Sequence, residues 1–244
     1  MLPRAHDSFL IRLARPDEDD ACTALENAVW APFQGGTDNG ELFLGYRYPE
    51  LHLVAVDQLD GTIVATAEAC PFAWDGQAEH LPARGWQQAT RAAAYGFASK
   101  PDYACALGIT VSPDVRGHGL SGVLIDALLD AAKQAGYKGL AAPVRPTEKW
   151  RMPDLTVADY AQIRLPDGRL FDPWLRLHEQ AGGQRLGVCE HSLDVEANRP
   201  DWERWTGLRL PSDGRLLIAG AVSYLELAND YGRLAEPSVW FLHE

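Results

Sequence analysis

The chain has 244 residues, of which 46% are hydrophobic and 23% are charged, so it has enough apolar material for a core and is not a largely disordered chain. Its 22 basic and 34 acidic side chains give a formal net charge of −12 without any basic block, which argues against nucleic acid or an anionic membrane surface as a partner. There is no run of roughly 20 apolar residues to span a bilayer, no signal peptide at the start and no C-x-x-C pair among the four cysteines, so we expect a cytoplasmic, reduced protein without a metal site or disulfide framework.

Hydrophobic periodicity divides the chain into alternating strands and helices. In chain order it predicts a strand at residues 9–13, a helix at 16–30, a glycine-rich loop at 35–40, a hairpin at 52–57 and 62–69, an irregular stretch at 71–85, a helix at 86–98, a strand at 103–111, a helix at 120–136, a strand at 138–144, a helix at 172–180, a strand at 185–194, and a tail with one short helix near Trp202 and one or two strands. The continuous apolar run at 103–111 is typical of a strand buried on both faces. This order predicts an α+β (mixed α/β) fold around a central sheet.

Two segments enlarge this arrangement. Residues 145–171 are rich in proline and charge and predict a long insertion, and residues 195–244 extend a core that runs from about residue 9 to 194. We therefore expect a single domain over residues 1–244. Many aromatic residues fall in this half, where they would either roof a substrate pocket or pack a larger sheet.

The most informative segment is residues 109–121, I-T-V-S-P-D-V-R-G-H-G-L-S. Pro113 ends strand pairing because it has no amide hydrogen, and an amphipathic helix begins directly after Gly119. Glycines let backbone amides approach a ligand, and a helix N-terminus with Arg116 beside it offers positive charge, so the segment predicts an anion-binding cradle. It is neither a P-loop, since no Lys-Ser or Lys-Thr follows the last glycine, nor a G-x-G-x-x-G fingerprint; the plainer alternative is a tight strand-to-helix connection.

The run R-G-H-G-L-S at 116–121 resembles the arginine/glutamine-x-x-glycine-x-glycine/alanine loop that binds the coenzyme A pyrophosphate in the GNAT superfamily of acyltransferases. The predicted order of elements between residues 9 and 194 is also similar to that fold, and the one departure, serine in the last small position, is nearly as small as alanine. The resemblance implies a splayed central mixed sheet flanked by helices and acetyl-CoA as the co-substrate. The cofactor-binding residues that it implies are Ile109, Thr110, Val111, Arg116, Gly117, His118, Gly119, Leu120 and Ser121.

The same resemblance implies where the acyl chain lies. In GNAT proteins the central strand splays from its neighbour and the pantetheine arm fills the wedge, which here would be lined by the backbone of residues 107–111. Many relatives place a glutamate base on this strand, but this chain has Gly108 in its middle and no carboxylate from Tyr103 to Val111. An amine of pKa about 10.4 costs roughly 4–5 kcal/mol to deprotonate at pH 7, so a base from elsewhere, or a water chain, is expected.

Three residues are candidates for proton transfer. His178 stands four residues before Gly182, where such enzymes often carry a tyrosine that protonates the leaving thiolate, and histidine exchanges a proton near neutral pH. Glu68 on the third predicted strand is a candidate base, and Thr147 at the start of the insertion is a further candidate. Each of them could instead be a surface, solvated or capping residue.

We expect an acyl-CoA-dependent N-acetyltransferase that acts on the amine of a small molecule, and the aromatic tail would permit a homodimer. Two alternatives stay open. Segments such as APVRPTEK and DPWLRLH are similar to a longer actinobacterial-type GNAT subgroup and, more faintly, to GNAT-like polyketide loading domains. Those domains use threonine and histidine to decarboxylate malonyl-CoA and to acetylate a carrier-protein thiol. In this chain, Thr147 and His178 would be that pair. The empty base position at Gly108 favours the other alternative, a non-catalytic acyl-CoA-binding protein.

Overall fold

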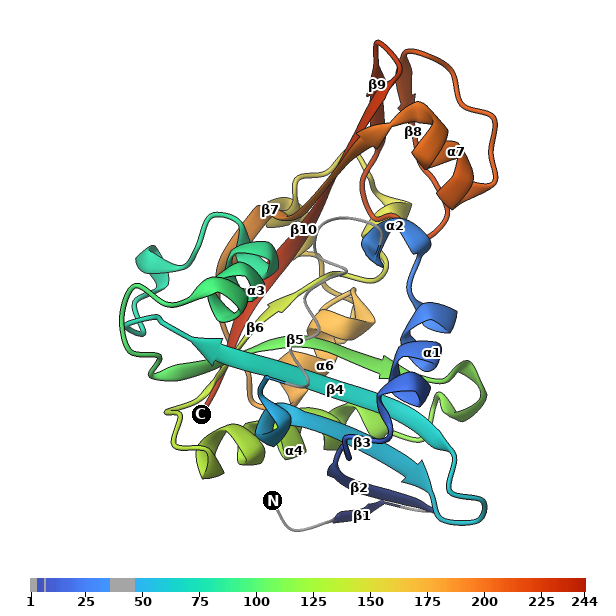
Figure 1. The fold of residues 1–244 in the computed structure, drawn as a ribbon. Helices are drawn as coiled ribbons and strands as arrows, with labels where there is room; N and C mark the ends of the chain where they lie inside the picture. Colours follow the sequence, from blue (N-terminus) through green and yellow to red (C-terminus); the bar gives the residue numbers. More distant parts are fainter. Residues whose placement is uncertain (1–3, 7, 36–46) are drawn as a thin grey trace.

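One ten-stranded mixed sheet organises the fold, in the order β1-β2-β3-β4-β5-β6-β10-β9-β8, with β7 paired to β10 (Figure 1). The computed structural model describes residues 4–6, 8–35 and 47–244, so most of the predicted glycine-rich loop lies outside the described residues. The strands are β1 (Arg4–His6), β2 (Phe9–Leu13), β3 (His52–Asp57), β4 (Ile63–Phe72), β5 (Tyr103–Val111), β6 (Leu140–Val144), β7 (Gln184–Asn198), β8 (Gly214–Leu216), β9 (Leu225–Ala228) and β10 (Tyr231–His243). The helices are α1 (Asp19–Val29), α2 (Pro32–Gly35), α3 (Gly85–Tyr95), α4 (Leu120–Gln134), α5 (Val157–Tyr160), α6 (Pro173–Gln180) and α7 (Arg199–Thr206). Among residues 4–6, 8–35 and 47–244, none of the helices has the length and hydropathy of a membrane span.

The β3–β4 hairpin forms where the sequence predicts it. Asp57 and Asp60 each accept the amide hydrogen of the residue two positions on, at 2.8 Å, and Gly61 adopts the positive φ (+80°) of the turn. The second strand is longer than predicted and runs on to Phe72, because its last residues pack into a buried cluster under α3. This register places His52 opposite Glu68 across β3 and β4.

The sheet divides at β5. This strand pairs with β4 along its whole length, but with β6 only at Ala104–Leu140 and Cys105–Ala141. Beyond residue 105 the two strands part, and residues 106–109 are half-buried where the sequence predicts full burial, because β6 no longer pairs with that edge. A bulge at Leu107 interrupts the β4 pairing on the other edge. The splayed mixed sheet that the family resemblance implies is present.

The C-terminal strand has a larger role than the sequence predicts. The tail holds three strands where one or two are expected, and the last of them, β10, pairs with β6 on one edge and β7 on the other. Its final residues are almost all buried, with Trp240 and Phe241 each 1% exposed. The apolar run at the end of the chain therefore forms an interior strand.

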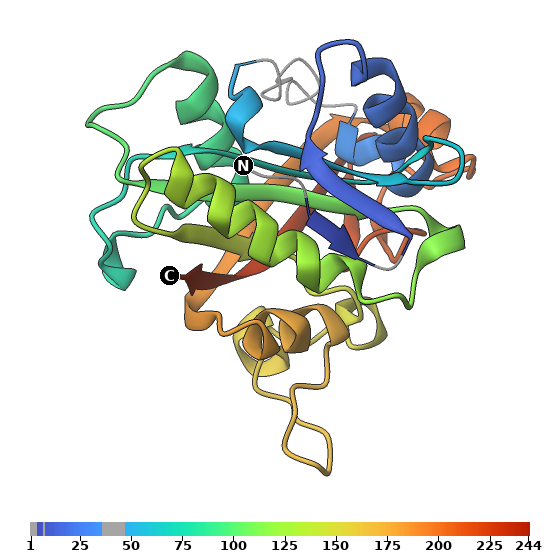
Figure 2. The same ribbon diagram turned by 90° about the horizontal axis from the view of Figure 1, so that it is seen from below.

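Helices cover both faces of the sheet (Figure 2). On one face, α4 packs Leu124 and Leu128 on a row of alanines from β4 and β5, whose small side chains let the helix approach closely. On the other face, Cys22 of α1 packs on β3, while Ala89 of α3 packs beside Cys70 of β4. Between α1 and α3 this second face of β4 and β5 carries polar side chains.

The predicted insertion is a structured segment that projects from the α4 face (Figure 2). It contains α5, and it is fixed to the body by Asp172, which is 2% exposed. One carboxylate oxygen of Asp172 caps α6 by accepting the amides of Trp174 and Leu175. The other accepts the Tyr160 hydroxyl at 2.9 Å and the Glu148 amide at 2.8 Å. This arrangement positions α6 beside the N-terminus of α4.

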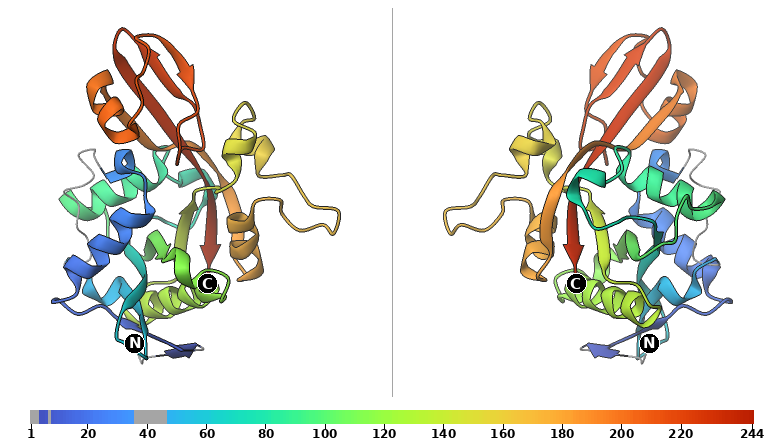
Figure 3. Two further views of the ribbon diagram at one scale, coloured as in Figure 1. Left: turned by 90° about the vertical axis from the view of Figure 1, so that its right-hand side faces the viewer. Right: turned by 90° about the vertical axis from the view of Figure 1, so that its left-hand side faces the viewer.

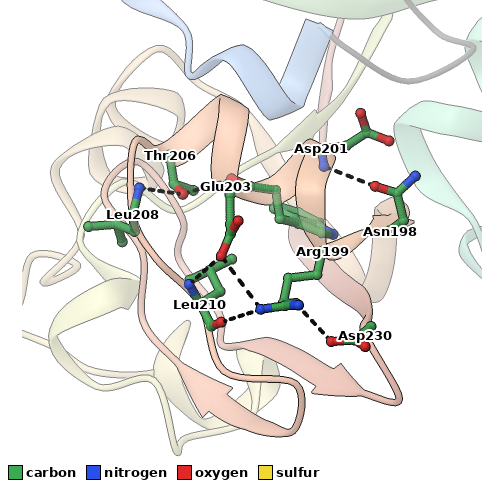
Figure 4. A network of polar contacts seen from close by, with 9 residues as sticks. Asn198, Arg199, Asp201, Glu203, Thr206, Leu208, Leu210 and Asp230 are labelled. Carbon is green, nitrogen blue, oxygen red and sulfur yellow. Dashed lines mark hydrogen bonds and ion pairs between the residues drawn. The ribbon is translucent and has the colours of Figure 1, made fainter.

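A C-terminal lobe, made of α7, β8, β9 and the far ends of β7 and β10, rises from the sheet around the buried Trp202 (Figure 3). Phe33 of α2 packs on Trp202 with ring centres 5.7 Å apart, which ties the lobe to the N-terminal half. Within the lobe, Arg199 holds α7 against the Leu210 carbonyl at 3.1 Å and the Asp230 carboxylate at 2.8 Å (Figure 4). The lobe is thus joined to the N-terminal half through the contact between α2 and α7.

Candidate active site

The loop between β5 and α4 encloses a cavity of about 230 Å³. Its lining residues are Val111, Val115, Arg116, Gly117, Gly119, Leu120, Ser121, Gly122 and Leu177. Gly117 and Gly119 both have positive φ (+90° and +72°), which favours glycine, and Gly119 is the N-cap of α4. The Gly122 amide donates to the Gly119 carbonyl at 3.1 Å, whereas Leu120 and Ser121 are in the first helical turn, whose amides have no carbonyl partner inside the helix. Those donors are available to an anion.

Arg116 adds the full positive charge of this cavity. Its Nε–H donates to the Val111 carbonyl at 3.4 Å, which turns the side chain back toward the end of β5. The loop is held from the other side by the N-terminal strands, since His6 Nε2 lies 2.6 Å from the His118 carbonyl and the His118 ring lies edge-on to Phe9. A fixed loop, a helix N-terminus and one guanidinium together fit a diphosphate group.

Three of the predicted cofactor residues lie outside this cavity lining, and one of them is His118, whose ring packs on Phe9. Ile109 packs against the core under α4, and Thr110 points to the opposite face, where its hydroxyl accepts the Trp30 indole N–H at 2.8 Å. The side chains of Ile109 and Thr110 therefore point to the two faces of the sheet, and only their backbone groups lie on the edge of β5 with which β6 no longer pairs. Their contact with an acyl chain stays a prediction.

The structure places Glu68 of β4 directly opposite Gly108, the position on β5 where many relatives carry a glutamate base. Glu68 and Gly108 are direct partners across β4 and β5, so both lie on the face between α1 and α3. A Cβ added at Gly108 would meet no heavy atom within 4 Å, so open space lies in front of this glycine. The carboxyl group of Glu68 lies on the same face of the sheet as this open space, and its Oε1 is 3.2 Å from His52 Nε2 of β3.

The surroundings of Glu68 make its carboxyl group a weak acid. Burial raises its pKa to about 8, and the nearby carboxylates of Glu26 and Asp19 add to the shift. Burial likewise raises the pKa of Glu26, which accepts a hydrogen bond from the Thr66 hydroxyl at 3.0 Å. A carboxyl group with this pKa can accept a proton from an amine and release it near neutral pH.

Two indoles flank the open space at Gly108. Trp30, just after α1, donates to Thr110, and Trp86 of α3 donates from Nε1 to the Leu107 carbonyl at 2.8 Å. The second bond fixes the bulged peptide of β5. Aromatic faces beside carboxyl groups form a favourable environment for an organic cation.

His178 is buried, with 4% of its surface exposed, and its ring is directed toward β10. Its Nδ1 lies 2.9 Å from His243 Nε2, and Trp174 and Phe241 pack on the ring. Burial lowers its pKa to about 3, with His243 as a second cause, so the ring is neutral at pH 7. The residue of α6 that reaches the loop cavity is the preceding one, Leu177. The proposed acid role of His178 stays a prediction.

Thr147 lies at the surface, in the turn that follows β6. Its role also stays a prediction. Within residues 4–6, 8–35 and 47–244, no group of three or more histidine, cysteine, aspartate or glutamate side chains is placed to hold a metal ion.

The residues around Glu68 were not singled out by sequence reasoning. Glu26 follows the buried Cys22 by four residues, which places it on the inner side of α1, and this spacing could have identified it. His52 follows from the alternation in the predicted hairpin, because it shares a face with the buried Val54. Trp86 carries no sequence signal, since its bond to β5 depends on how α3 packs.

Comparisons with known proteins identify the family and the fold of this chain. The family model described as the acetyltransferase (GNAT) family matches residues 22–151. An arginine N-acetyltransferase of Aspergillus versicolor, avaD, is 31% identical over 224 residues, covering 81% of this chain and 75% of the relative. Among solved structures, the loading GNATL domain of CurA from Lyngbya majuscula has a TM-score of 0.62 at 18% identity, over 75% of this chain and 87% of that one. The GphF GNAT-like decarboxylase, solved with isobutyryl-CoA, has a TM-score of 0.59 at 25% identity, over 75% of this chain and 90% of that one.

Proposed function

Because this chain belongs to the GNAT family of acetyltransferases and is an acyltransferase with acetyl-CoA as co-substrate, we propose that it acetylates the primary amine of a small cationic molecule. The observation that carries the proposal is the carboxyl group of Glu68, which lies on the same face of the sheet as the open space at Gly108 and the indoles that bond to Thr110 and Leu107. Family membership gives an amine-type acceptor; the small size and the positive charge of that acceptor are our proposal.

The loop cavity fits the diphosphate of the co-substrate. We assign the diphosphate to the first-turn amides of Leu120 and Ser121 and to the guanidinium of Arg116, because these donors line the cavity together. Bound acetyl-CoA supplies an acetyl group activated as a thioester. The free edge of β5 from residue 106 onward offers backbone groups that would orient the acyl arm, and the Trp86–Leu107 bond keeps that edge rigid.

Glu68 is our candidate base. An ammonium group of pKa about 10.4 must lose a proton before its nitrogen can attack, and a base with a pKa near the working pH does this best. The pKa of Glu68, raised to about 8 by burial and by neighbouring carboxylates, meets that requirement. This assignment replaces the glutamate that many GNAT enzymes carry on the strand of Gly108 with one on the paired strand.

The charge of the acceptor follows from the same surroundings. Three carboxyl groups, those of Glu26, Glu68 and Asp19, lie near one another, and the indole of Trp30 lies on the same face. Among the described residues, no cationic side chain lowers the pKa of Glu26 or of Glu68. A cation gains from carboxylates and from aromatic faces, whereas an anion would be repelled. The similarity to an arginine N-acetyltransferase supports this choice and makes arginine-like amines the first compounds to test.

His178 remains the candidate for protonating the departing thiolate. Since its ring is neutral at pH 7, the proton would have to reach His178 during the reaction. The hydrogen-bonded partner His243 is the nearest group that could exchange it.

The test is an acceptor panel with acetyl-CoA. The purified protein is incubated with L-arginine, agmatine, L-lysine, ethanolamine and L-glutamate, and the acetylated products are identified by mass spectrometry while the released thiol is titrated. We expect agmatine, L-arginine and L-lysine, which carry a second cationic group besides the reacting amine, to react fastest, and Glu68→Gln to lower their turnover by about 10²–10⁴-fold. Faster acetylation of L-glutamate or ethanolamine, or full activity of the Glu68→Gln variant, would contradict the proposal.

A second candidate function is decarboxylation of malonyl-CoA with transfer to a carrier-protein thiol. The similarity in sequence and fold to the GphF GNAT-like decarboxylase favours it, and Thr147 and His178 would be its residues. Incubation with malonyl-CoA and a phosphopantetheinylated carrier protein separates the two. Release of carbon dioxide would support the second candidate, and its absence together with acetylated amine would support the first.

A further inference from the structure

His52 is a buried titratable residue that the mechanism above does not use. It is 4% exposed and lies opposite Glu68 across the β3–β4 pair, on the same face of the sheet. Its Nε2 is 3.2 Å from Glu68 Oε1, and this nitrogen is fully buried and forms no hydrogen bond of good geometry among the described residues. The Glu68 carboxyl group therefore lies within ion-pair distance of a buried imidazole nitrogen that has no hydrogen-bond partner in the described part of the chain.

The remaining charged and titratable groups around this pair come mainly from α1. They are Asp19, Cys22 and Glu26 of α1, Cys70 of β4, and the Glu18–Arg12 ion pair at the start of α1. Asp19 acts on both members, since its charge raises the pKa of His52 and of Glu68. One oxygen of Asp19 is itself buried and forms no hydrogen bond in the described part of the chain. A positive charge on His52 would therefore be compensated.

We propose that His52 is a positioning residue that shares one proton with Glu68 and, by taking that proton, leaves Glu68 as a carboxylate facing the acceptor amine. The inference rests on the proposed function for its catalytic meaning, but the shared proton is a property of the free protein. It assigns a role to a residue on β3, two strands away from the strand that carries the co-substrate wedge.

The proton steps balance as follows. In the resting pair the proton is on Glu68 Oε1 and the lone pair is on His52 Nε2. The O–H bond breaks and an N–H bond forms, which gives an imidazolium beside a carboxylate with no change in total charge. The ammonium group of the acceptor then transfers one proton to Glu68, so the pair holds two protons and the amine is neutral. One of the two protons later leaves to solvent, which restores the pair.

The pKa shifts of Glu68 and His52 explain why Glu68 needs a partner that takes its proton. Burial, together with the charges of Glu26 and Asp19, raises the pKa of Glu68 to about 8, and burial lowers the pKa of His52, so each group by itself is neutral at pH 7. A protonated Glu68 cannot accept a proton. Glu68 alone binds the proton more tightly than His52 does, but the attraction between an imidazolium and a carboxylate 3.2 Å apart favours the transferred state and so removes this obstacle.

The first test follows His52 in the free protein by nitrogen-15 NMR over pH 4–9, with its resonances assigned from the His52→Gln variant. In Glu68→Gln the imidazolium loses its partner, so we expect the midpoint of His52 to fall by about one pH unit or more. Glu190→Gln, the same change at an exposed position on β7, should leave the midpoint unchanged. An unchanged midpoint in Glu68→Gln would overturn the proposal, whatever the acceptor panel shows.

The second test is the pH profile of kcat/KM for the best acceptor. His52→Gln should move the acid limb upward by about one pH unit and recover to near the wild-type value above pH 9, because Glu68 then ionises without help. His80→Gln, which changes an exposed histidine paired with Asp75 at 2.7 Å, is the matched control and should leave the profile in place. A uniform loss at all pH values, with the limb unmoved, would indicate a structural role and contradict the proposal. If no amine is acetylated but the NMR shift is found, the shared proton stands and the proposed function fails.

Discussion

The two halves of the candidate site lie on different sides of β5 and are built from different material. The proposed cofactor half consists of one continuous segment, the loop after β5 and the first turn of α4, and it offers backbone amides, two glycines of positive φ and one guanidinium. The acceptor half consists of side chains from separate segments. These are Glu26 and Trp30 from α1 and its C-cap, His52 from β3, Glu68 from β4 and Trp86 from α3.

This difference separates what a fold family shares from what one member does. A diphosphate is the same in every acyl-CoA, so a backbone cradle that depends on local geometry can serve any acceptor. The acceptor differs between members, and side chains brought from four segments can change one at a time without disturbing the cradle. Variants that change one half should therefore leave the other half intact.

The largest effect is expected for Glu68→Gln, which keeps the size of the side chain and removes the base. We expect kcat to fall by about 10²–10⁴-fold, the usual contribution of a general base, while the Kd of acetyl-CoA from isothermal titration stays within about twofold. Glu190→Gln is the matched control, because Glu190 is exposed on β7. A kcat within tenfold of the wild type would remove Glu68 from the mechanism.

In the cofactor half, Arg116→Ala should weaken the binding of acetyl-CoA and leave the acceptor site intact. Removing one charge-assisted contact to a diphosphate costs about 1.5–3 kcal/mol, which corresponds to a rise of roughly 10–100-fold in the Kd of acetyl-CoA. At saturating acetyl-CoA, the KM of the acceptor should be unchanged. Arg204→Ala, at an exposed arginine of α7 paired with Asp201, serves as the control. An unchanged Kd in Arg116→Ala would show that the cavity holds something other than the diphosphate.

The same contrast explains how far the sequence could predict the structure. The bounds of β5 and the start of α4 were predicted to the residue, because a buried apolar run, a proline and two glycines act over a few positions. The binding of a diphosphate by the cradle stays a prediction. The burial in the middle of β5 was not, since it depends on where β6 stops pairing, after Cys105. The interior place of β10 was missed for a similar reason, because it pairs residues about 100 positions apart.

The acceptor half shows this limit most clearly. Glu68 was named as a candidate, but its meaning comes from its register with Gly108 on one side and His52 on the other. The register of β4 with β5 shifts at the bulge at Leu107, and the register of β3 with β4 shifts between Ala55 and Val56; no local sequence pattern predicts either shift. His178 illustrates the opposite case: its place in the sequence was informative, but the direction of its ring toward β10 was not readable.

A smaller effect is expected for Trp86→Phe, which removes the indole N–H that donates to the Leu107 carbonyl. The ring still fills its place, so the loss is that of one hydrogen bond, about 0.5–1.5 kcal/mol, and kcat/KM for the acceptor should fall by roughly 2–13-fold. Trp205→Phe, at an indole in the C-terminal lobe, should leave kcat/KM unchanged. Equal losses in the two variants would point to a general loss of stability instead of a disturbed β5 edge.

The smallest effect is on stability and comes from the raised pKa of Glu68. This group titrates at about 8 in the folded protein and at about 4.3 when unfolded, so between these values the folded state binds more protons than the unfolded state. The free energy of unfolding therefore falls as the pH rises from about 5 to 8. Glu68→Gln cannot ionise, so its Tm at pH 8.5 should exceed that of the wild type by about 2–4 °C for each kcal/mol recovered, whereas at pH 5 the two should agree. Parallel Tm curves from calorimetry at pH 5, 6.5 and 8.5 would mean that Glu68 has the same pKa in the folded and the unfolded protein. A carboxyl group with an ordinary pKa would then contradict the base assigned to the acceptor half.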